Sequence, residues 1–252
     1  MRYVLCLRWH AAASVLRCSH LNRALGCQAK METMDNVKKY EDSVSGWVRL
    51  ELEPHKEQLL QGKHAGIVTN DYLKTLYMGF HDIQETLSAL ELSQFLISND
   101  APRIKEVTDV RYYRYVATTY LQDMYILKER LNAYATKIKR VHNTLGRHHF
   151  VNYFVEPLFP QIKSCFQNIV DVRGFHVHQQ RYTDDSFDDA LVFRALSTNE
   201  IELSNIADLS VELLREEWSE KIEVNNSAVK KFLNYYFGCL FIVIQHEGEL
   251  IE

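Results

Sequence analysis

The sequence is poor in the residues that interrupt regular secondary structure. It has 9 Gly and 4 Pro in 252 residues, which is about half the usual share of these two residue types. All-β sandwiches and barrels need many tight turns, so this scarcity argues against them. Collagen-like and low-complexity chains are excluded for the same reason. With 46% hydrophobic and 12% aromatic residues, the chain can bury a substantial core. The composition therefore predicts a soluble, globular, mainly helical protein.

Acidic residues are missing from the start of the chain. The protein has 29 Lys and Arg against 33 Asp and Glu, a net charge of −4, but no acidic residue precedes Glu32. The first 31 residues carry +5 and the rest −9. An acid-free, arginine-bearing start resembles a transit peptide, and the alternative is that Met31 or Met34 is the true initiator. We therefore expect a basic N-terminal extension, residues 1–33, and a single helical domain over residues 34–252.

Cysteines are also few outside that extension, where only Cys165 and Cys239 remain. Two cysteines cannot form a disulfide framework, and this predicts a reducing, cytoplasmic location, or an organelle if the extension is a targeting signal. The most apolar run, Tyr235–Ile244, has ten residues with a glycine inside. A bilayer span needs about twenty apolar residues. We expect a buried core helix there and no membrane partner.

Two long segments place apolar residues three and four positions apart. The first runs from Leu73 to Leu90 behind the N-cap candidates Asn70 and Asp71. The second covers residues 111–141. This spacing is that of a helix with one buried face. We expect an antiparallel helical hairpin joined by the polar stretch Ser98–Thr108.

Further helices are expected in the second half of the chain. A third begins near Pro157, since proline suits the first helical turn. An acidic loop, 183–189, follows, and then a short apolar run near 190–196 that can be a strand, an irregular segment or the start of a helix. A fourth helix starts near residue 204, and a fifth follows the polar triplet 225–227. The fourth is strongly acidic and contains the apolar residues Ile206, Leu209, Leu213 and Leu214. The predicted fold class is an all-α bundle of about five long helices.

Several motifs of known chemistry are absent from the sequence. It has neither of the glycine-rich phosphate-binding loops, no H-E-x-x-H zinc motif and no C-x-x-C pair,. The Glu-x-x-His pairs of di-iron helical bundles are also absent,. We therefore predict no cofactor and no metal site.

One segment does carry a pattern, DVRGFHVHQQRY at residues 171–182, in which four residues separate Arg173 from His178. It resembles the HEPN superfamily (higher eukaryotes and prokaryotes nucleotide-binding), whose hallmark is Arg, four to six residues, then His, at the end of a long helix in an all-α bundle. The resemblance implies a homodimeric, metal-independent endoribonuclease with the motif at the dimer interface. Gly174 departs from the family, which often has Asn or Asp directly after the Arg.

The resemblance also implies roles for individual residues. His178 would move a proton as general base or acid, and Arg173 would hold the phosphate and stabilise transition-state charge. His176 would assist, and Arg181 and Tyr182 would contact the RNA backbone or a base.

Three alternatives to catalysis remain open for this segment. Arg173 at a helix C-terminus can be purely structural, pairing with a nearby aspartate. The bundle can be a non-catalytic module that binds a nucleotide or a protein. His176 and His178 can instead ligate a metal with oxygen ligands from the aspartates at 184–189.

Overall fold

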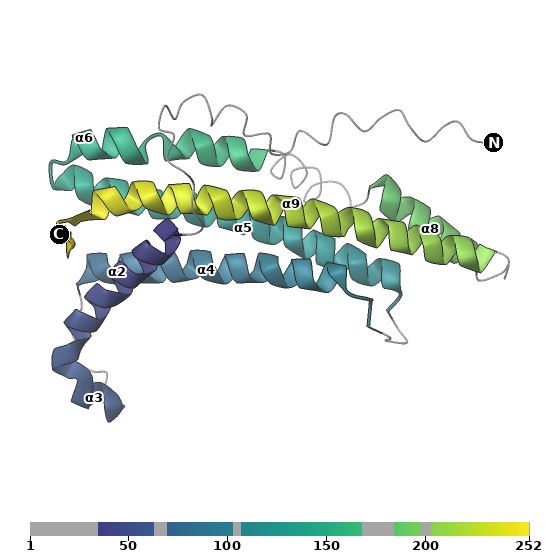
Figure 1. The fold of residues 1–252 in the computed structure, drawn as a ribbon, viewed down its shortest axis with the longest axis horizontal. Helices are drawn as coiled ribbons and strands as arrows, with labels where there is room; N and C mark the ends of the chain where they lie inside the picture. The colour runs from purple at the N-terminus through teal and green to yellow at the C-terminus, as the bar shows by residue number, and fades with distance from the viewer. Residues whose placement is uncertain (1–34, 63–69, 103–106, 168–183, 198–202, 252) are drawn as a thin grey trace. The chain divides into compact units, whose positions relative to one another are not determined.

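Three long helices, α4, α5 and α9, form the centre of the structure (Figure 1). The computed structural model describes residues 35–62, 70–102, 107–167, 184–197 and 203–251. The central helices are α4 (Asp71–Ser98), α5 (Asp109–Thr144) and α9 (Ser204–Ile244). Contacts such as Tyr72 with His142 and Tyr112 with Leu96 show that α4 and α5 are antiparallel. The predicted all-α bundle and its helical hairpin are confirmed.

Smaller elements surround these three helices. α2 (Asp35–Leu52) packs on α4 and α9, and the π-helical turn η2 (Val151–Val155) packs on α5 and α9. α8 (Asp185–Ser197) lies along the N-terminal half of α9 (Figure 1). The remaining elements are η1 (Glu53–His55), α3 (Lys56–Leu60), α6 (His148–Phe150), helical residues 158–167, and the antiparallel pair β1 (Gln245–His246) and β2 (Glu249–Leu250).

The ends of the hairpin helices are set by side-chain caps. The Asn70 carboxamide oxygen accepts hydrogen bonds from the backbone N–H groups of Tyr72 and Leu73, at 2.8 and 2.9 Å. Thr108 accepts one from the backbone N–H of Arg111 at the start of α5. Each cap satisfies donors that a helix leaves unpaired at its N-terminus. α4 ends at Ser98 and α5 begins at Asp109, which confirms the two ends of the predicted connection Ser98–Thr108.

The third helical region begins earlier than the prolines indicated. The chain is already helical from His148 and widens into η2, where the backbone N–H of Glu156 donates to Val151, five residues back, at 2.9 Å. Pro157 and Pro160 lack the N–H groups that would continue this pattern. The prolines therefore mark where the π turn gives way to helical residues 158–167.

The predicted break between a fourth and a fifth helix is wrong, because α9 runs unbroken through the triplet 225–227. Asn226 donates to the Leu90 carbonyl and to Gln94 Oε1, and accepts from the Tyr120 hydroxyl. An asparagine interrupts a helix mainly when its side chain competes for local backbone groups. Here the neighbouring helices satisfy the amide instead.

The expected loop at 183–189 is also wrong, because residues 185–197 form helix α8. Of the alternatives for 190–196, the helix holds, and it begins five residues earlier than that run. Asp184 caps the helix by accepting from the backbone N–H of Phe187 at 3.1 Å. Acidic residues in a first turn interact favourably with the helix dipole. The acidic cluster is therefore a helix start, and Phe187 and Ala190 bury its inner face.

Among the described helices, α9 is long and apolar enough to cross a membrane by length and composition alone. Half of its most apolar stretch is buried inside the bundle. The core helix of a helical bundle meets the same criteria.

Aromatic side chains fill the core where α2 meets the central helices. Tyr40 lies 4.8 Å from Phe237 and 5.6 Å from Phe80 between ring centroids. Its hydroxyl is 2.6 Å from that of Tyr134, which donates to the Leu76 carbonyl. These buried hydroxyls are therefore satisfied within the core.

Gly79 allows this packing, because a Cβ at that position would overlap the Tyr134 ring, whereas one at Gly46 would meet open space. We expect Gly79→Ala to lower the free energy of unfolding by about 1–3 kcal/mol. The control Gly46→Ala is expected to raise it by about 0.5–1 kcal/mol, because alanine is the better helix former. Urea titrations followed by circular dichroism measure both. A Gly79→Ala protein as stable as the parent would show that the ring does not pack there.

A second buried polar group, His142, lies near the C-terminal end of α5, eight residues beyond Tyr134. His142 is fully buried, with Nε2 2.8 Å from the Tyr72 hydroxyl and Nδ1 3.1 Å from Arg147 Nη1. Arginine can only donate, so Nδ1 accepts and Nε2 carries the proton. Burial, together with the nearby Arg147 charge, lowers the pKa of His142 to about 4.

This neutral histidine makes stability depend on pH. Between the ordinary pKa of 6.5 and the lowered value of about 4, the unfolded chain binds a proton that the folded protein does not. The contribution of neutral His142 to the free energy of unfolding is therefore complete above pH 6.5. It is lost as the pH falls towards 4, which lowers the free energy of unfolding by up to about 3 kcal/mol. Urea titrations across this range measure it. His142→Asn removes the titrating ring and should flatten the dependence, and an unchanged slope would contradict the assignment.

Candidate functional site

The residues implied by the HEPN resemblance lie in the segment 168–183, outside the described residues. They are Arg173, His176, His178, Arg181 and Tyr182. In sequence, the motif comes shortly after helical residues 158–167 and before α8. Its geometry, and with it the choice between a catalytic and a structural role, stays a prediction.

Two aspartates offered by the metal alternative are engaged in other contacts. Asp184 accepts from the Trp218 indole N–H at 3.2 Å as well as capping α8. Asp188 forms an ion pair with Arg114 of α5. Across the described part of the chain, no group of three or more His, Cys, Asp or Glu side chains is placed to hold a metal ion.

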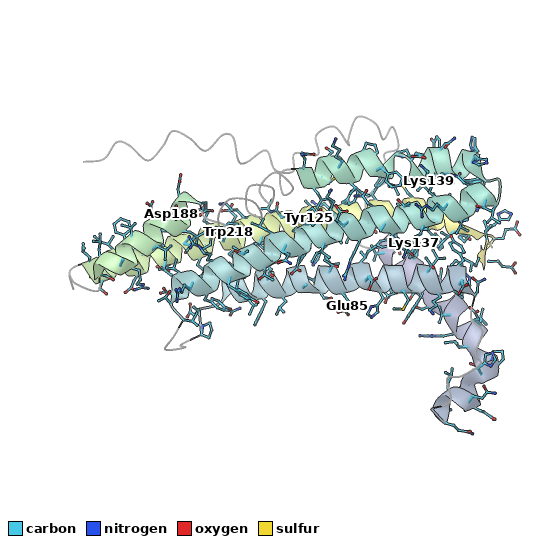
Figure 2. The ribbon with its side chains drawn as sticks, turned by 180° about the vertical axis from the view of Figure 1, so that it is seen from behind. Glu85, Tyr125, Lys137, Lys139, Asp188 and Trp218 are labelled. Atoms are coloured by element: carbon cyan, nitrogen blue, oxygen red, sulfur yellow. The ribbon has the colours of Figure 1, made fainter. Side chains whose placement is uncertain are left out.

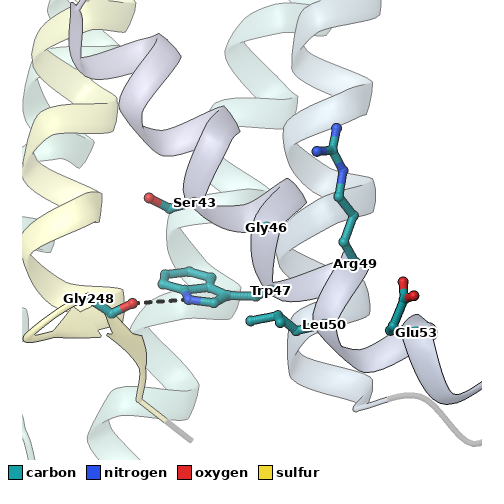
Figure 3. Close-up of a pocket in the computed structure, with 7 residues that line it drawn as sticks. All are labelled: Ser43, Gly46, Trp47, Arg49, Leu50, Glu53 and Gly248. Atoms are coloured by element: carbon teal, nitrogen blue, oxygen red, sulfur yellow. Dashed lines mark hydrogen bonds between the residues drawn. The ribbon is translucent and has the colours of Figure 1, made fainter.

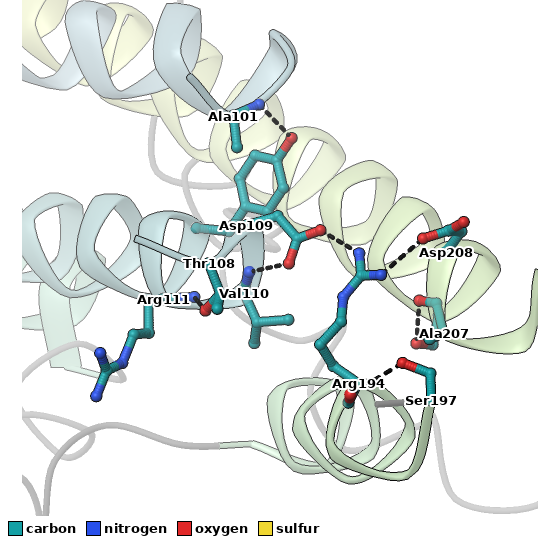
Figure 4. Close-up of polar contacts among 11 residues, drawn as sticks. Ala101, Thr108, Asp109, Val110, Arg111, Arg194, Ser197, Ala207 and Asp208 are labelled. Carbon is teal, nitrogen blue, oxygen red and sulfur yellow. Dashed lines mark hydrogen bonds and ion pairs between the residues drawn. The ribbon is translucent and has the colours of Figure 1, made fainter. Parts of the chain in front are cut away.

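The helical hairpin of α8 and α9 is fastened to the bundle by an arginine. Arg194 reaches from α8 between Asp208 of α9, at 2.7 Å, and Asp109 at the start of α5 (Figure 4). This clamp borders a polar cleft of about 350 Å³, where Arg215 pairs with Asp100. Both guanidinium groups already bind carboxylates. The ion pairs of this cleft therefore have a structural role and hold the helices together.

A second set of contacts fixes the other end of the same hairpin. The Phe187 ring lies 5.8 Å from that of Trp218, with the Arg114 guanidinium 5.7 Å from the Phe187 ring. Ser186 donates to Glu217 at 2.6 Å. Figure 2 shows Asp188 on α8 and Trp218 on α9 in this region. Attachment at both ends presents the N-terminal half of α9 as a rigid surface.

That half of α9 carries apolar residues on the side facing away from the bundle. Ile206, Leu209 and Leu213 are 45%, 55% and 56% exposed, and Val224 is 58% exposed. Residues three and four apart share one face of a helix. The opposite side of the same half is buried, at Ala207, Val211, Leu214, Trp218 and Ile222.

Acidic residues accompany this apolar stripe. Glu212, Glu216, Glu220 and Glu223 are all exposed, and none forms an ion pair with a cation among the described residues. The two cations of the same half are occupied, Arg215 by Asp100 and Lys221 by Glu217. We define the α9 outer face as these four glutamates together with Ile206, Leu209, Leu213 and Val224.

A shallow hollow of about 540 Å³ lies between α2 and the C-terminal strands. The Trp47 indole donates to the Gly248 carbonyl at 3.2 Å, and Leu50 lies beside it (Figure 3). Arg49 and Glu53 give its rim opposite charges. This hollow gathers no set of groups suited to chemistry, so the α9 outer face is the stronger candidate site.

No model of a known protein family matches this chain, and no curated protein or solved structure is similar to it. Sequence reasoning placed Ile206, Leu209 and Leu213 on a helix but did not identify them as an exposed surface. No sequence signal separated them from the buried residues Ala207, Val211 and Leu214, which have the same helical spacing. Function is therefore inferred from this surface and from the Arg–His motif.

Proposed function

We propose that this protein is a non-catalytic helical interaction module that binds a protein partner through the α9 outer face. The observation that carries the proposal is the alignment of Ile206, Leu209 and Leu213 along one exposed side of an anchored helix. Because these side chains are about half exposed, complete burial by a partner would contribute about 1 kcal/mol for each of them.

Scattered exposed leucines are common on soluble proteins, so the arrangement matters more than the number. Here the leucines line up at helical spacing on a hairpin held by Arg194 and by the Phe187–Trp218 contact. A preformed surface loses little conformational entropy on binding. These features support a docking role.

The proposal predicts that a photo-reactive amino acid at position 209 will crosslink a partner in an extract of the cells that make the protein. Mass spectrometry should identify a discrete adduct. Excess unmodified protein should suppress it, whereas excess Leu209→Asp/Leu213→Asp protein should not, because the competitor has lost its apolar contacts.

The matched control places the same photo-reactive group at Tyr153, which is 70% exposed on η2. The interaction module is contradicted if position 209 gives only the adducts seen from position 153, or if the double variant competes as well as the parent. Circular dichroism should show that the double variant is folded, since both side chains are solvent-exposed.

A second candidate function rests on the Arg173–His178 motif. We propose that it cleaves RNA without a metal. The ribose 2′-hydroxyl loses its proton to His178 and attacks the adjacent phosphorus, and the bond to the 5′-oxygen breaks. Arg173 would stabilise the charge on the phosphate oxygens. The departing 5′-oxygen takes up a proton from water, and a 2′,3′-cyclic phosphate remains at the 3′ end of the other product strand.

This second proposal predicts that the full chain cleaves labelled RNA in the presence of EDTA. Arg173→Ala and His178→Ala should each lower the rate by about 10²-fold or more, because each removes a group used in the transition state. The control His81→Ala removes an exposed histidine of α4 and should change nothing. Cleavage that survives both motif substitutions would reject the assigned roles, and loss of cleavage in EDTA would favour a metal.

A further inference from the structure

The α9 outer face has an apolar stripe and a row of exposed glutamates, which both run along the helix axis. Its apolar side chains run from Ile206 to Val224, a length of about 27 Å at 1.5 Å per helical residue. Exposed glutamates lie beside them along the same stretch. Over residues 204–224 the chain has six acidic and two basic residues, and the two basic ones are already in ion pairs.

From this arrangement we infer that the α9 outer face binds a basic amphipathic helix of a partner protein, an inference that rests on the proposed interaction function. Apolar residues of the partner at three- and four-residue spacing would pack on Ile206, Leu209 and Leu213. Packing of this kind is how one helix lies on the apolar surface of another. Lysines and arginines beside that stripe would meet Glu212, Glu216 and Glu220.

The charge of the surface excludes two other classes of ligand. An anionic lipid surface attracts basic segments, and the exposed glutamates of the α9 outer face would be repelled by it. RNA and DNA are held mainly through their phosphates, which need cations. A protein helix can supply the apolar stripe and the cations together.

The same charge argues against a second copy of this chain. A two-fold dimer brings the same patch of both subunits together. Pairing the α9 outer face with itself would place Glu212, Glu216 and Glu220 opposite a second set of glutamates. Like charges facing each other across an interface cost several kcal/mol. The geometry therefore favours a partner of opposite charge.

The test uses the full-length protein and a fluorescent helical peptide of about 18 residues, long enough to cover residues 206–224 at the helical rise. The peptide has leucines along one side and lysines elsewhere. Fluorescence anisotropy should show saturable binding that weakens as salt is added. Two further peptides are needed: one with glutamates in place of the lysines, and one with the same composition but no apolar stripe. Both should bind at least about tenfold more weakly.

Charge-reversed variants test the surface directly. Glu216→Lys/Glu220→Lys should weaken binding of the basic peptide by about tenfold or more and should now bind the acidic peptide. The matched control, Glu41→Lys/Asp42→Lys, makes the same change in net charge at two exposed positions of α2. It should bind the basic peptide as the parent does.

Each other result overturns the inference. Equal loss in the α2 control, or equal binding of the peptide without a stripe, would mean unspecific attraction of charge. Stronger binding of the acidic peptide by the parent would assign the opposite partner. If sedimentation shows a dimer and Leu209→Asp/Leu213→Asp abolishes it, the ligand of the α9 outer face is a second copy of this chain. If the protein binds anionic vesicles through the same residues, the ligand is a membrane.

The experiments distinguish a failure of the interaction module from a failure of the basic-helix ligand. If position 209 crosslinks a specific partner while the basic peptide does not bind, the interaction module stands and the basic helix is wrong. If no specific crosslink forms, the interaction function itself is wrong.

Discussion

Asn226 lies midway along α9 with 2% of its surface exposed, and its amide bonds to both other central helices. Its nitrogen donates to the Leu90 carbonyl of α4, and its oxygen accepts from Tyr120 of α5. Leaving this buried amide unpaired would cost about 1–3 kcal/mol. A single well-paired polar group in an apolar contact can select one register of helices over others. Asn226 thereby fixes how α4, α5 and α9 are aligned.

Because α9 is continuous through Asn226, its two halves can have different roles. Beyond Asn226, the C-terminal half is enclosed, with Phe232, Tyr236 and Phe237 buried among aromatic side chains. Before it, the N-terminal half buries only its inner side and is held by Arg194. A break at 225–227 would separate the two. Continuity lets the core hold the α9 outer face in a fixed orientation.

The sequence predicted the α4–α5 hairpin well, because its apolar spacing agrees with a strong local signal, the Asn70 cap. It failed at 225–227, where packing overrides local propensity. The α9 outer face could not be predicted because two sets of apolar residues share helical spacing, one at 206, 209 and 213 and one at 207, 211, 214 and 218. Only packing shows which set is buried. The Arg173–His178 site stays a prediction from its motif.

The charge distribution separates the two functions proposed for this chain. A net charge of −4 combines a +5 extension with a −9 remainder, and the N-terminal half of α9, residues 204–224, is acidic, with six acidic and two basic residues. RNA bound near this surface would be repelled, so cleavage requires local cations such as Arg173 and Arg181. A protein ligand has the opposite requirement, since glutamates beside an apolar stripe attract basic side chains. One surface cannot bind both ligands, because a cation placed on α9 to bind phosphate would weaken the binding of a basic partner helix. The charges therefore restrict the RNA proposal to the motif segment and the basic-helix proposal to the α9 outer face.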